Sequence, residues 1–247
     1  MKTVFITGAT AGFGLALAHK YANEGYHVIA TGRRKERLEA LQSSYKEGTI
    51  DILCFDIQDT DAIEKAVSSL TSHIDILINN AGLATGGLQN LEDVSWNDIS
   101  TMINTNIIGL VFLTKQILPL MKQRNSGHII NIGSVSGTYP YKGAAVYGGT
   151  KAFVEMFSLN LRAELLGTDI RVSNIEPGIA DTEFSLVRFS DEERAKQVCE
   201  NFQALTAEDI AEIVYFTSIV PPHVNINSIE IMSTHQAFAG FAIHRGT

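Results

Sequence analysis

The chain has 247 residues, of which 45% are hydrophobic and 19% are charged, and its formal net charge is −8 at pH 7. This length and apolar fraction fit one globular domain with a large core, whereas the acidic balance argues against a nucleic-acid partner, which would need a basic face. Two cysteines, Cys54 and Cys199, do not require a disulfide scaffold, so we expect free thiols in a reducing compartment.

The predicted elements alternate along the whole chain between short apolar runs rich in Val and Ile and longer amphipathic stretches. The predicted strands are residues 3–7, 27–31, 50–55, 74–79, 127–132, 170–175 and 228–232. The predicted helices include residues 14–23, 35–45, 60–70, 96–123, 146–166 and 207–218. This alternation is typical of strand-helix-strand units around a buried parallel sheet. It predicts one α/β domain over residues 1–247, a doubly wound parallel sheet of about seven strands with helices on both faces.

No segment predicts export or a membrane span. The apolar run at residues 4–6 is far too short for a signal core and leads straight into a glycine turn. No uncharged apolar stretch reaches the roughly 20 residues that cross a bilayer. We therefore expect a soluble, cytoplasmic protein with no membrane partner.

The loop after the first strand is rich in glycine and leads into a helix. Gly8, Gly12 and Gly14 permit a tight turn, a close approach of the backbone to a pyrophosphate, and close packing of helix on strand. The helix N-terminus offers free N–H groups to phosphates. A simple turn is the alternative, but the strand-loop-helix context favours a Rossmann-type dinucleotide site. The residues assigned to it are Gly8, Ala9, Thr10, Gly12, Phe13 and Gly14.

The residues after the second strand indicate which dinucleotide binds. An NAD enzyme commonly places an acid there for the ribose 2′-hydroxyl, whereas arginine accommodates a 2′-phosphate. Here Arg33 and Arg34 follow the strand, and the first acid is Glu36. Two solvated arginines in a first helical turn are the alternative, but cations are unfavourable at a helix N-terminus, so a nearby anion explains them better. We predict NADP as the cofactor.

Two further strand ends predict cofactor contacts. Asp56 and Ile57 close the third strand and could border the adenine. Asn80, Ala81 and Gly82 follow the fourth strand and are small or polar where the chain must pass close to a ligand.

A tyrosine and a lysine in the helix at residues 146–166 are candidate catalytic residues. Tyr147 and Lys151 are four residues apart, so they share one helix face. An ammonium next to a phenol stabilises the phenolate and lowers its pKa towards the range useful for acid-base catalysis. The pair alone is weak evidence for a catalytic site, because a tyrosine and a lysine at this spacing are common on exposed helices. Two further residues strengthen the case for catalysis. Ser134 follows the fifth strand, and Asn106 is a poor helix former inside a predicted helix.

With these motifs, the chain resembles the short-chain dehydrogenase/reductase family over essentially its whole length. The glycine loop, the Asn-Asn-Ala-Gly of residues 79–82, Ser134, the Tyr-x-x-x-Lys of residues 147–151 and Pro177-Gly178 occur in the family's order. The resemblance implies that Tyr147 is the acid/base, that Ser134 polarises the substrate oxygen, and that Lys151 holds ribose hydroxyls and tunes Tyr147. It also implies that Asn106 keeps a relay water and that Thr182 meets the nicotinamide carboxamide. Pro177 and Gly178 are assigned to the cofactor site.

Within the family, the chain looks most like bacterial NADP-dependent 3-hydroxy acid dehydrogenases, which act on serine, allo-threonine and small 3-hydroxy and 3-oxo acids. Arg188, flanked by Val187 and Phe189, is the candidate to hold the substrate carboxylate. A surface arginine paired with Asp191 or Glu192 is an equal alternative. A reductase of another carbonyl substrate, such as a 3-oxoacyl thioester, a sugar or a simple ketone, is also open, as is a non-catalytic NADP-binding regulator.

Residues 182–205 interrupt the alternation of strands and helices, and we interpret them as a substrate lid because ligands bind beyond the carboxyl ends of such strands. A plain surface excursion is the alternative. The seven histidines show no ligand spacing, so no metal is assigned. The C-terminal tail, with His235, Phe238, Phe241 and His244, is interpreted as packing or interface, and the resemblance implies a homotetramer.

Overall fold

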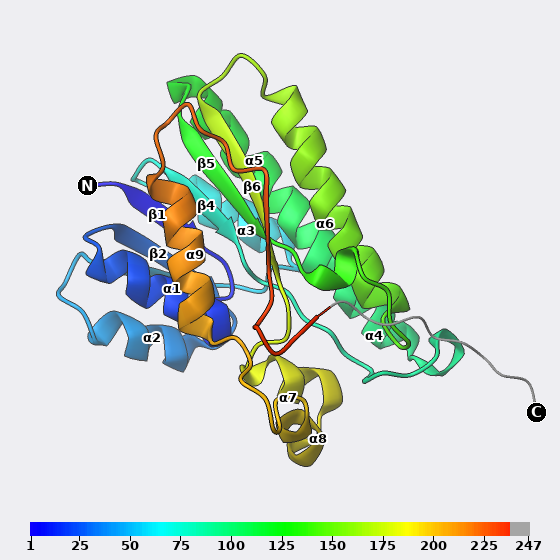
Figure 1. Cartoon of the computed structure of the whole chain (residues 1–247). Helices are drawn as coiled ribbons and strands as arrows, with labels where there is room; N and C mark the ends of the chain where they lie inside the picture. Colours follow the sequence, from blue (N-terminus) through cyan, green and yellow to red (C-terminus); the bar gives the residue numbers. More distant parts are fainter. Residues whose placement is uncertain (238–247) are drawn as a thin grey trace, which may run out of the picture.

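The computed structural model describes residues 1–237, in which seven parallel strands form one sheet of order β3-β2-β1-β4-β5-β6-β7 (Figure 1). The strands are β1 (Thr3–Ile6), β2 (His27–Gly32), β3 (Ile50–Cys54), β4 (Ile76–Asn79), β5 (Gly127–Ile132), β6 (Ile170–Pro177) and β7 (Ser228–Ile231). The strand order reverses between β1 and β4, and in such sheets the ligand crevice opens beyond the carboxyl ends at this reversal. The predicted doubly wound α/β fold is confirmed.

Helices cover both faces of the sheet, and each face has its own hydrophobic core. The helices are α1 (Gly12–Asn23), α2 (Lys35–Ser43), α3 (Thr60–Ser68), α4 (Trp96–Ile103), α5 (Leu110–Arg124), α6 (Ala145–Glu164), α7 (Glu183–Phe189), α8 (Glu192–Gln197) and α9 (Ala207–Ile219). Residues of α1, α2 and α9 pack on one face, and residues of α3, α5 and α6 pack on the other. Short turns occur at η1 (Leu91–Asp93), η2 (Asn104–Gly109) and η3 (Val135–Gly137).

The inner strands explain the continuous apolar runs of the sequence. Every residue of β1 and β4 is buried, since helices cover both sides of these strands. The edge strand β7 differs, because its residues alternate between exposed and half-buried positions. A strand at the rim has less to pack against, so only one of its faces contributes strongly to the core.

One stretch, Trp96–Arg124, is long and apolar enough by length and composition to cross a membrane, with a mean hydropathy of 1.2. It contains Lys115 and is interrupted by the π-helical turn η2. Its α5 part packs Leu113 and Ile117 into one core of the domain, where both side chains are fully buried. One side of α5 therefore belongs to the core, and 39% of the apolar window is buried inside the protein.

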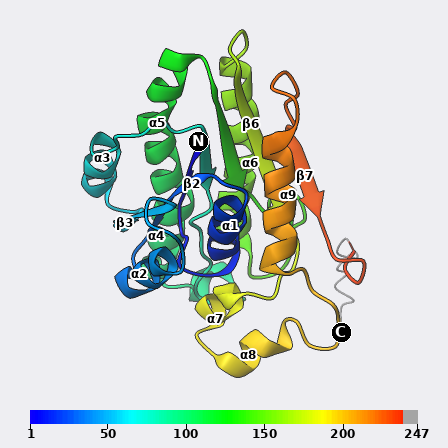
Figure 2. The same ribbon diagram turned by 90° about the vertical axis from the view of Figure 1, so that its left-hand side faces the viewer.

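Residues 182–205 form α7 and α8, which lie together beyond one end of the sheet (Figures 1 and 2). The segment starts and ends at one place, because Asp181 N donates to Leu205 O at 2.8 Å and Leu205 N donates to Ile179 O at 3.1 Å. It is therefore a helical excursion with a narrow base at the carboxyl end of β6. The sequence analysis predicted a lid or a surface excursion here without assigning its secondary structure, and the structure shows two short helices.

Candidate active site

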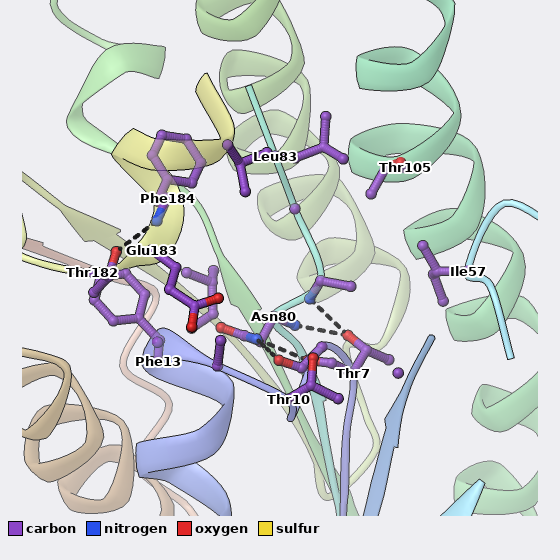
Figure 3. A pocket seen from close by; sticks show the side chains of 18 of the residues that line it. Thr7, Thr10, Phe13, Ile57, Asn80, Leu83, Thr105, Thr182, Glu183 and Phe184 are labelled. Atoms are coloured by element: carbon purple, nitrogen blue, oxygen red, sulfur yellow. Dashed lines mark hydrogen bonds between the residues drawn. The ribbon is translucent and has the colours of Figure 1, made fainter. Parts of the chain in front are cut away.

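A cleft of about 360 Å³ opens at the carboxyl ends of the central strands (Figure 3). It collects predicted residues from seven separate places in the chain. Those that line it are Gly8, Thr10, Gly12, Phe13, Arg33, Arg34, Asp56, Ile57, Asn80, Ala81, Gly82, Ser134, Tyr147, Lys151, Pro177, Gly178 and Thr182. Four predicted residues, Ala9, Gly14, Asn106 and Arg188, lie behind or beside the cleft and do not line it.

The glycine loop leaves space that side chains would fill. Gly8 has a φ of +69° and Gly12 a φ of +51°, a left-handed conformation that L-residues rarely adopt. A Cβ on Gly14 would lie 2.2 Å from the Gly8 carbonyl oxygen, so α1 can approach the glycine loop this closely only without a side chain at position 14. The cap residue Ala11 provides no side-chain hydrogen bond to the first turn of α1. The free N–H groups of that turn therefore face the cleft, which fits a pyrophosphate.

Thr7 fixes the loop after β4 against the glycine loop, a role that the sequence did not reveal. Its Oγ1 accepts hydrogen bonds from Asn80 N at 3.0 Å and from Ala81 N at 2.9 Å. The Asn80 side chain in turn donates to Thr7 O at 2.8 Å (Figure 3). The two loops that border the cleft are thus held as one unit, with the Asn80 side chain used as a structural brace.

The two predicted phosphate-binding arginines differ in their surroundings. Arg33 is exposed and donates to Asp56 Oδ2 at 3.2 Å. Arg34 donates through Nε and Nη2 to Thr10 Oγ1 at 3.0 and 2.8 Å, and through Nη1 to Glu183 Oε2 at 2.9 Å. Both sit at the start of α2, whose cap has no side-chain hydrogen bond. Guanidinium groups beside free helix N–H groups form a cationic rim that suits a ribose 2′-phosphate.

Ser134, Tyr147 and Lys151 lie together and are buried, with 8% of Tyr147 and 6% of Lys151 exposed. Ser134 follows β5 and caps η3, where its Oγ accepts from Ser136 N at 3.1 Å. Lys151 Nζ donates to Ile132 O at 2.7 Å and lies 5.8 Å from the centre of the Tyr147 ring. A phenol, a hydroxyl and an ammonium thus converge beside the glycine-lined end of the cleft.

Burial dominates the electrostatics of this pair. It raises the pKa of Tyr147 to about 12, an effect that the Ser134 hydroxyl partly opposes. Burial also lowers the pKa of Lys151 to about 8, because the ammonium loses hydration. The prediction that the Lys151 ammonium brings the pKa of Tyr147 down towards the useful range is therefore wrong for the protein without cofactor and substrate. Spacing along a helix does not reveal how deeply both groups are buried.

Asn106 lies in the π-helical turn η2, between α4 and α5. Its side-chain Oδ1 accepts from Leu83 N at 2.9 Å, and its Nδ2 donates to Leu83 O at 2.9 Å and to Thr150 Oγ1 at 3.0 Å. The amide thereby ties the loop after β4 to α6, the helix that carries Tyr147. Single π-helical turns often occur at functional sites because they re-aim a side chain.

Arg188 reaches Tyr147 from α7. Its Nη2 donates to Tyr141 Oη at 2.7 Å, and its guanidinium carbon lies 5.0 Å from the centre of the Tyr147 ring. Its Nε is buried and has no hydrogen-bond partner among the described residues. Asp191 caps α8 and pairs with Arg194, so the alternative of a surface pair with Asp191 is not what the structure shows.

Several residues at the site were not predicted. Arg37 donates to Thr10 O at 3.3 Å and to both oxygens of Glu183, at 2.7 and 2.9 Å. Tyr141 contacts Arg188, and Phe184 packs on Tyr147 with ring centres 5.5 Å apart. In the sequence, only their positions could have indicated that these residues belong to the site. Glu183 and Phe184 adjoin the predicted Thr182, and Arg37 follows the arginine pair. Over residues 1–237, no group of three or more His, Cys, Asp or Glu side chains could hold a metal ion.

Comparisons with known proteins agree with this geometry. The family model described as short chain dehydrogenase matches residues 2–193. NADP-dependent 3-hydroxy acid dehydrogenase YdfG of Salmonella typhi is 51% identical over 247 residues, which cover 98% of this chain and 99% of the relative. Serine 3-dehydrogenase of Agrobacterium fabrum is 48% identical over 248 residues, with 98% of each chain covered.

A solved structure shares the fold closely. The closed form of a serine dehydrogenase complexed with NADP+ superimposes with a TM-score of 0.96 and 48% identity, and the match covers 99% of this chain and 100% of that one. The two chains therefore share the arrangement of the whole domain, including the helical excursion at the mouth of the cleft.

Proposed function

The chain belongs to the short chain dehydrogenase family, and from this premise we propose that it is an NADP-dependent oxidoreductase acting on small 3-hydroxy and 3-oxo acids. The names of the relatives support both the cofactor and the substrate class. The cationic rim of Arg33 and Arg34 supports NADP over NAD independently. The buried Ser134, Tyr147 and Lys151 support catalysis over a purely regulatory role.

The single observation that carries the substrate class is the position of Arg188. A guanidinium with a buried, unpartnered Nε lies 5.0 Å from the ring of the proton-exchanging tyrosine. A carboxylate a few bonds away from the reacting carbon would satisfy this donor and be held in two-point contact. Serine, allo-threonine and 3-hydroxypropionate all have a carboxylate at that separation. A sugar or a simple ketone would leave the guanidinium unpaired.

The residues perform the chemistry as follows. Arg188 binds the carboxylate, and Ser134 donates a hydrogen bond to the substrate oxygen and orients it. In the oxidation, Tyr147 must be ionised for its Oη to take the hydroxyl proton, so its pKa must fall from about 12 towards the working pH. Lys151, freed from Ile132 O, would turn its ammonium to the phenol and the ribose and lower that pKa. The chemistry that NADP supplies when bound is acceptance of the hydride.

We assign Asn106 and residues 182–205 supporting roles. The amide of Asn106 braces the loop after β4 against α6, and its carbonyl oxygen lies beside Gly82 and Lys151. This position suits the proposed relay water next to Lys151. The segment 182–205 contributes Thr182, Phe184 and Val187 to the wall of the cleft, which suits a lid that excludes water.

We further propose a cytoplasmic homotetramer with no nucleic-acid or membrane partner. Helix α6 exposes Phe153, Met156 and Leu159, with 39%, 56% and 40% of each residue accessible, and Leu120 of α5 is also exposed. Apolar side chains repeated on one helix face are typical of a subunit interface. Of the C-terminal tail, His235 accepts from Gln203 N, while Phe238, Phe241 and His244 lie outside the described residues. Light scattering of the purified protein tests the subunit number.

The test of the activity is NADP reduction with L-serine, L-allo-threonine, 3-hydroxypropionate and a secondary alcohol without a carboxylate, each repeated with NAD. We expect turnover of the acids with NADP and little turnover of the plain alcohol. Turnover of the alcohol alone would keep the Tyr147 chemistry and refute the substrate class. Absence of any turnover, with normal NADPH binding, would favour the regulatory alternative.

A further inference from the structure

Helix α7 is held at both ends by residues of the cofactor and substrate sites. At its first residue, the Glu183 carboxylate accepts from Arg34 Nη1 at 2.9 Å and from Arg37 Nη1 at 2.7 and 2.9 Å. Near its last residue, Arg188 donates to Tyr141 and lies over the Tyr147 ring. One short helix therefore connects the arginines proposed to bind the 2′-phosphate with the tyrosine proposed to exchange the proton.

The contact at Glu183 is a network of three charges and not an isolated pair. Single exposed ion pairs contribute little, because long side chains lose freedom when they pair. Here Arg34 is already held by Thr10 Oγ1 and Arg37 by Thr10 O, so much of that freedom is lost before Glu183 binds. In Figure 3 the Glu183 side chain extends from α7 towards this corner of the pocket. Along the chain, Glu183 lies 149 positions after Arg34 and 146 positions after Arg37.

Besides the charge network, α7 is fixed to the body of the protein by Phe184, which packs on Tyr147, and by the buried Ser185. The helix packs mainly on α8, which belongs to the same excursion. Leu186 and Val187 are largely exposed, and Gly87 N donates to Arg188 O at 2.9 Å. Segments with few buried apolar contacts open locally at low free-energy cost. The charge network at Glu183 therefore contributes to the position of α7, together with the Phe184 contact on Tyr147.

We propose that Glu183 is a positioning residue: by bridging to Arg34 and Arg37 it fixes α7, and through α7 it sets Arg188 beside Tyr147. The expected effect on the substrate KM rests on the proposed function, in which Arg188 holds the substrate carboxylate. The anchoring of α7 by Glu183 does not depend on that function. Substrate affinity then depends on a carboxylate that does not touch the substrate. By linkage, the arginines that face the cofactor influence the substrate site through the same helix.

The anchoring is tested by hydrogen exchange of residues 182–190 in the protein without added ligand. The variants are Glu183→Gln, Arg37→Gln and the double variant. The matched control is Glu192→Gln, since Glu192 begins α8 as Glu183 begins α7 but forms no ion pair among the described residues. We expect Glu183→Gln to exchange about fivefold faster and Arg37→Gln less so, because Arg34 keeps its bond to Glu183. The double variant should exchange no faster than Glu183→Gln, and the control should not change. An equal effect of the control, or additive effects of the two variants, would overturn the anchoring.

The positioning role is tested by kinetics with 3-hydroxypropionate and a carboxylate-free alcohol. We expect Glu183→Gln to raise KM for the acid roughly five- to tenfold while kcat and the KM for the alcohol stay within about twofold. Faster exchange with an unchanged KM would overturn the positioning of Arg188. Tighter NADPH binding by Glu183→Gln, measured by fluorescence titration, would also overturn the proposal, because Glu183 would then compete with the cofactor phosphate. Failure of the proposed function itself would appear separately, as a wild-type protein with no preference for acids.

Discussion

Replacing Arg188 by alanine separates carboxylate recognition from the chemistry. In this structure the guanidinium touches Tyr141 Oη and the faces of Tyr147 and Phe184, while its Nε has no hydrogen-bond partner within residues 1–237. The substitution removes the proposed clamp and leaves Ser134, Tyr147 and Lys151 in place. Tyr141 is partly exposed, so its hydroxyl can bind water in place of Arg188 and the fold should be little affected.

The size of the effect follows from the geometry of the donor. A charge-assisted hydrogen bond contributes about 1.5–3 kcal/mol, and a carboxylate on Nε and Nη2 would make two. Because Arg188 is only half-buried, solvent screens part of this contribution, and we expect a loss of about 3 kcal/mol. That is roughly a 100-fold fall in kcat/KM for 3-hydroxypropionate.

The assay compares 3-hydroxypropionate with its methyl ester, which has the same reacting carbon but no charge. Arg188→Ala should reduce kcat/KM for the ester by less than about threefold. For the acid, the kcat/KM of Arg188→Lys should lie between those of the wild type and Arg188→Ala, because lysine keeps the charge and loses the two-donor guanidinium. Melting temperatures control for stability. Equal losses for the acid and the ester would refute the reasoning, because the effect would then be on the fold or on the position of Tyr147.

Three further predictions follow from the site. Tyr147→Phe should lower kcat by about 10²–10⁴-fold and leave the NADPH dissociation constant nearly unchanged in a fluorescence titration, whereas retained turnover would remove the tyrosine from the mechanism. Arg33→Ala, which leaves the Glu183 network intact, should weaken NADP about tenfold and NAD hardly at all; equal weakening would exclude a 2′-phosphate contact. Lys151→Met should abolish activity yet raise Tm at pH 7 by roughly 2–4 °C, because burial of the ammonium costs more than its bond to Ile132 O returns. The penalty is full below the folded pKa of about 8 and disappears as pH rises towards the unfolded value, so a gain in Tm that persists above pH 10.5 would contradict this origin.

The sequence allowed much of the fold and the outline of the cleft to be predicted. Apolar runs marked the buried strands, and because parallel strands end at one edge, the residues after each strand had to meet there. Gly8, Asn80, Ser134 and Pro177 are brought together for this reason. Their chemical roles stay predictions, whereas the family resemblance is confirmed by the match to residues 2–193.

The remainder depends on contacts that no local pattern encodes. Glu183 meets Arg37 across 146 positions, and Tyr141 meets Arg188 across 47. The π-helical turn at Asn106 requires one residue more than an α-helical turn, which hydrophobic periodicity could not distinguish from a continuous helix. The raised pKa of Tyr147 arises from burial in the folded domain, and helix spacing alone does not report burial.

A crystal structure of the protein with NADP and malonate, an unreactive three-carbon mimic of a 3-oxo acid, tests the central claim most directly. We expect one carboxylate of malonate within about 3 Å of Arg188 Nε and Nη2, and the other carboxylate in hydrogen-bond contact with Ser134 and Tyr147. A malonate bound without Arg188, with the guanidinium still on Tyr141 and its Nε unpaired, would contradict the assignment of 3-hydroxy acids as the substrates.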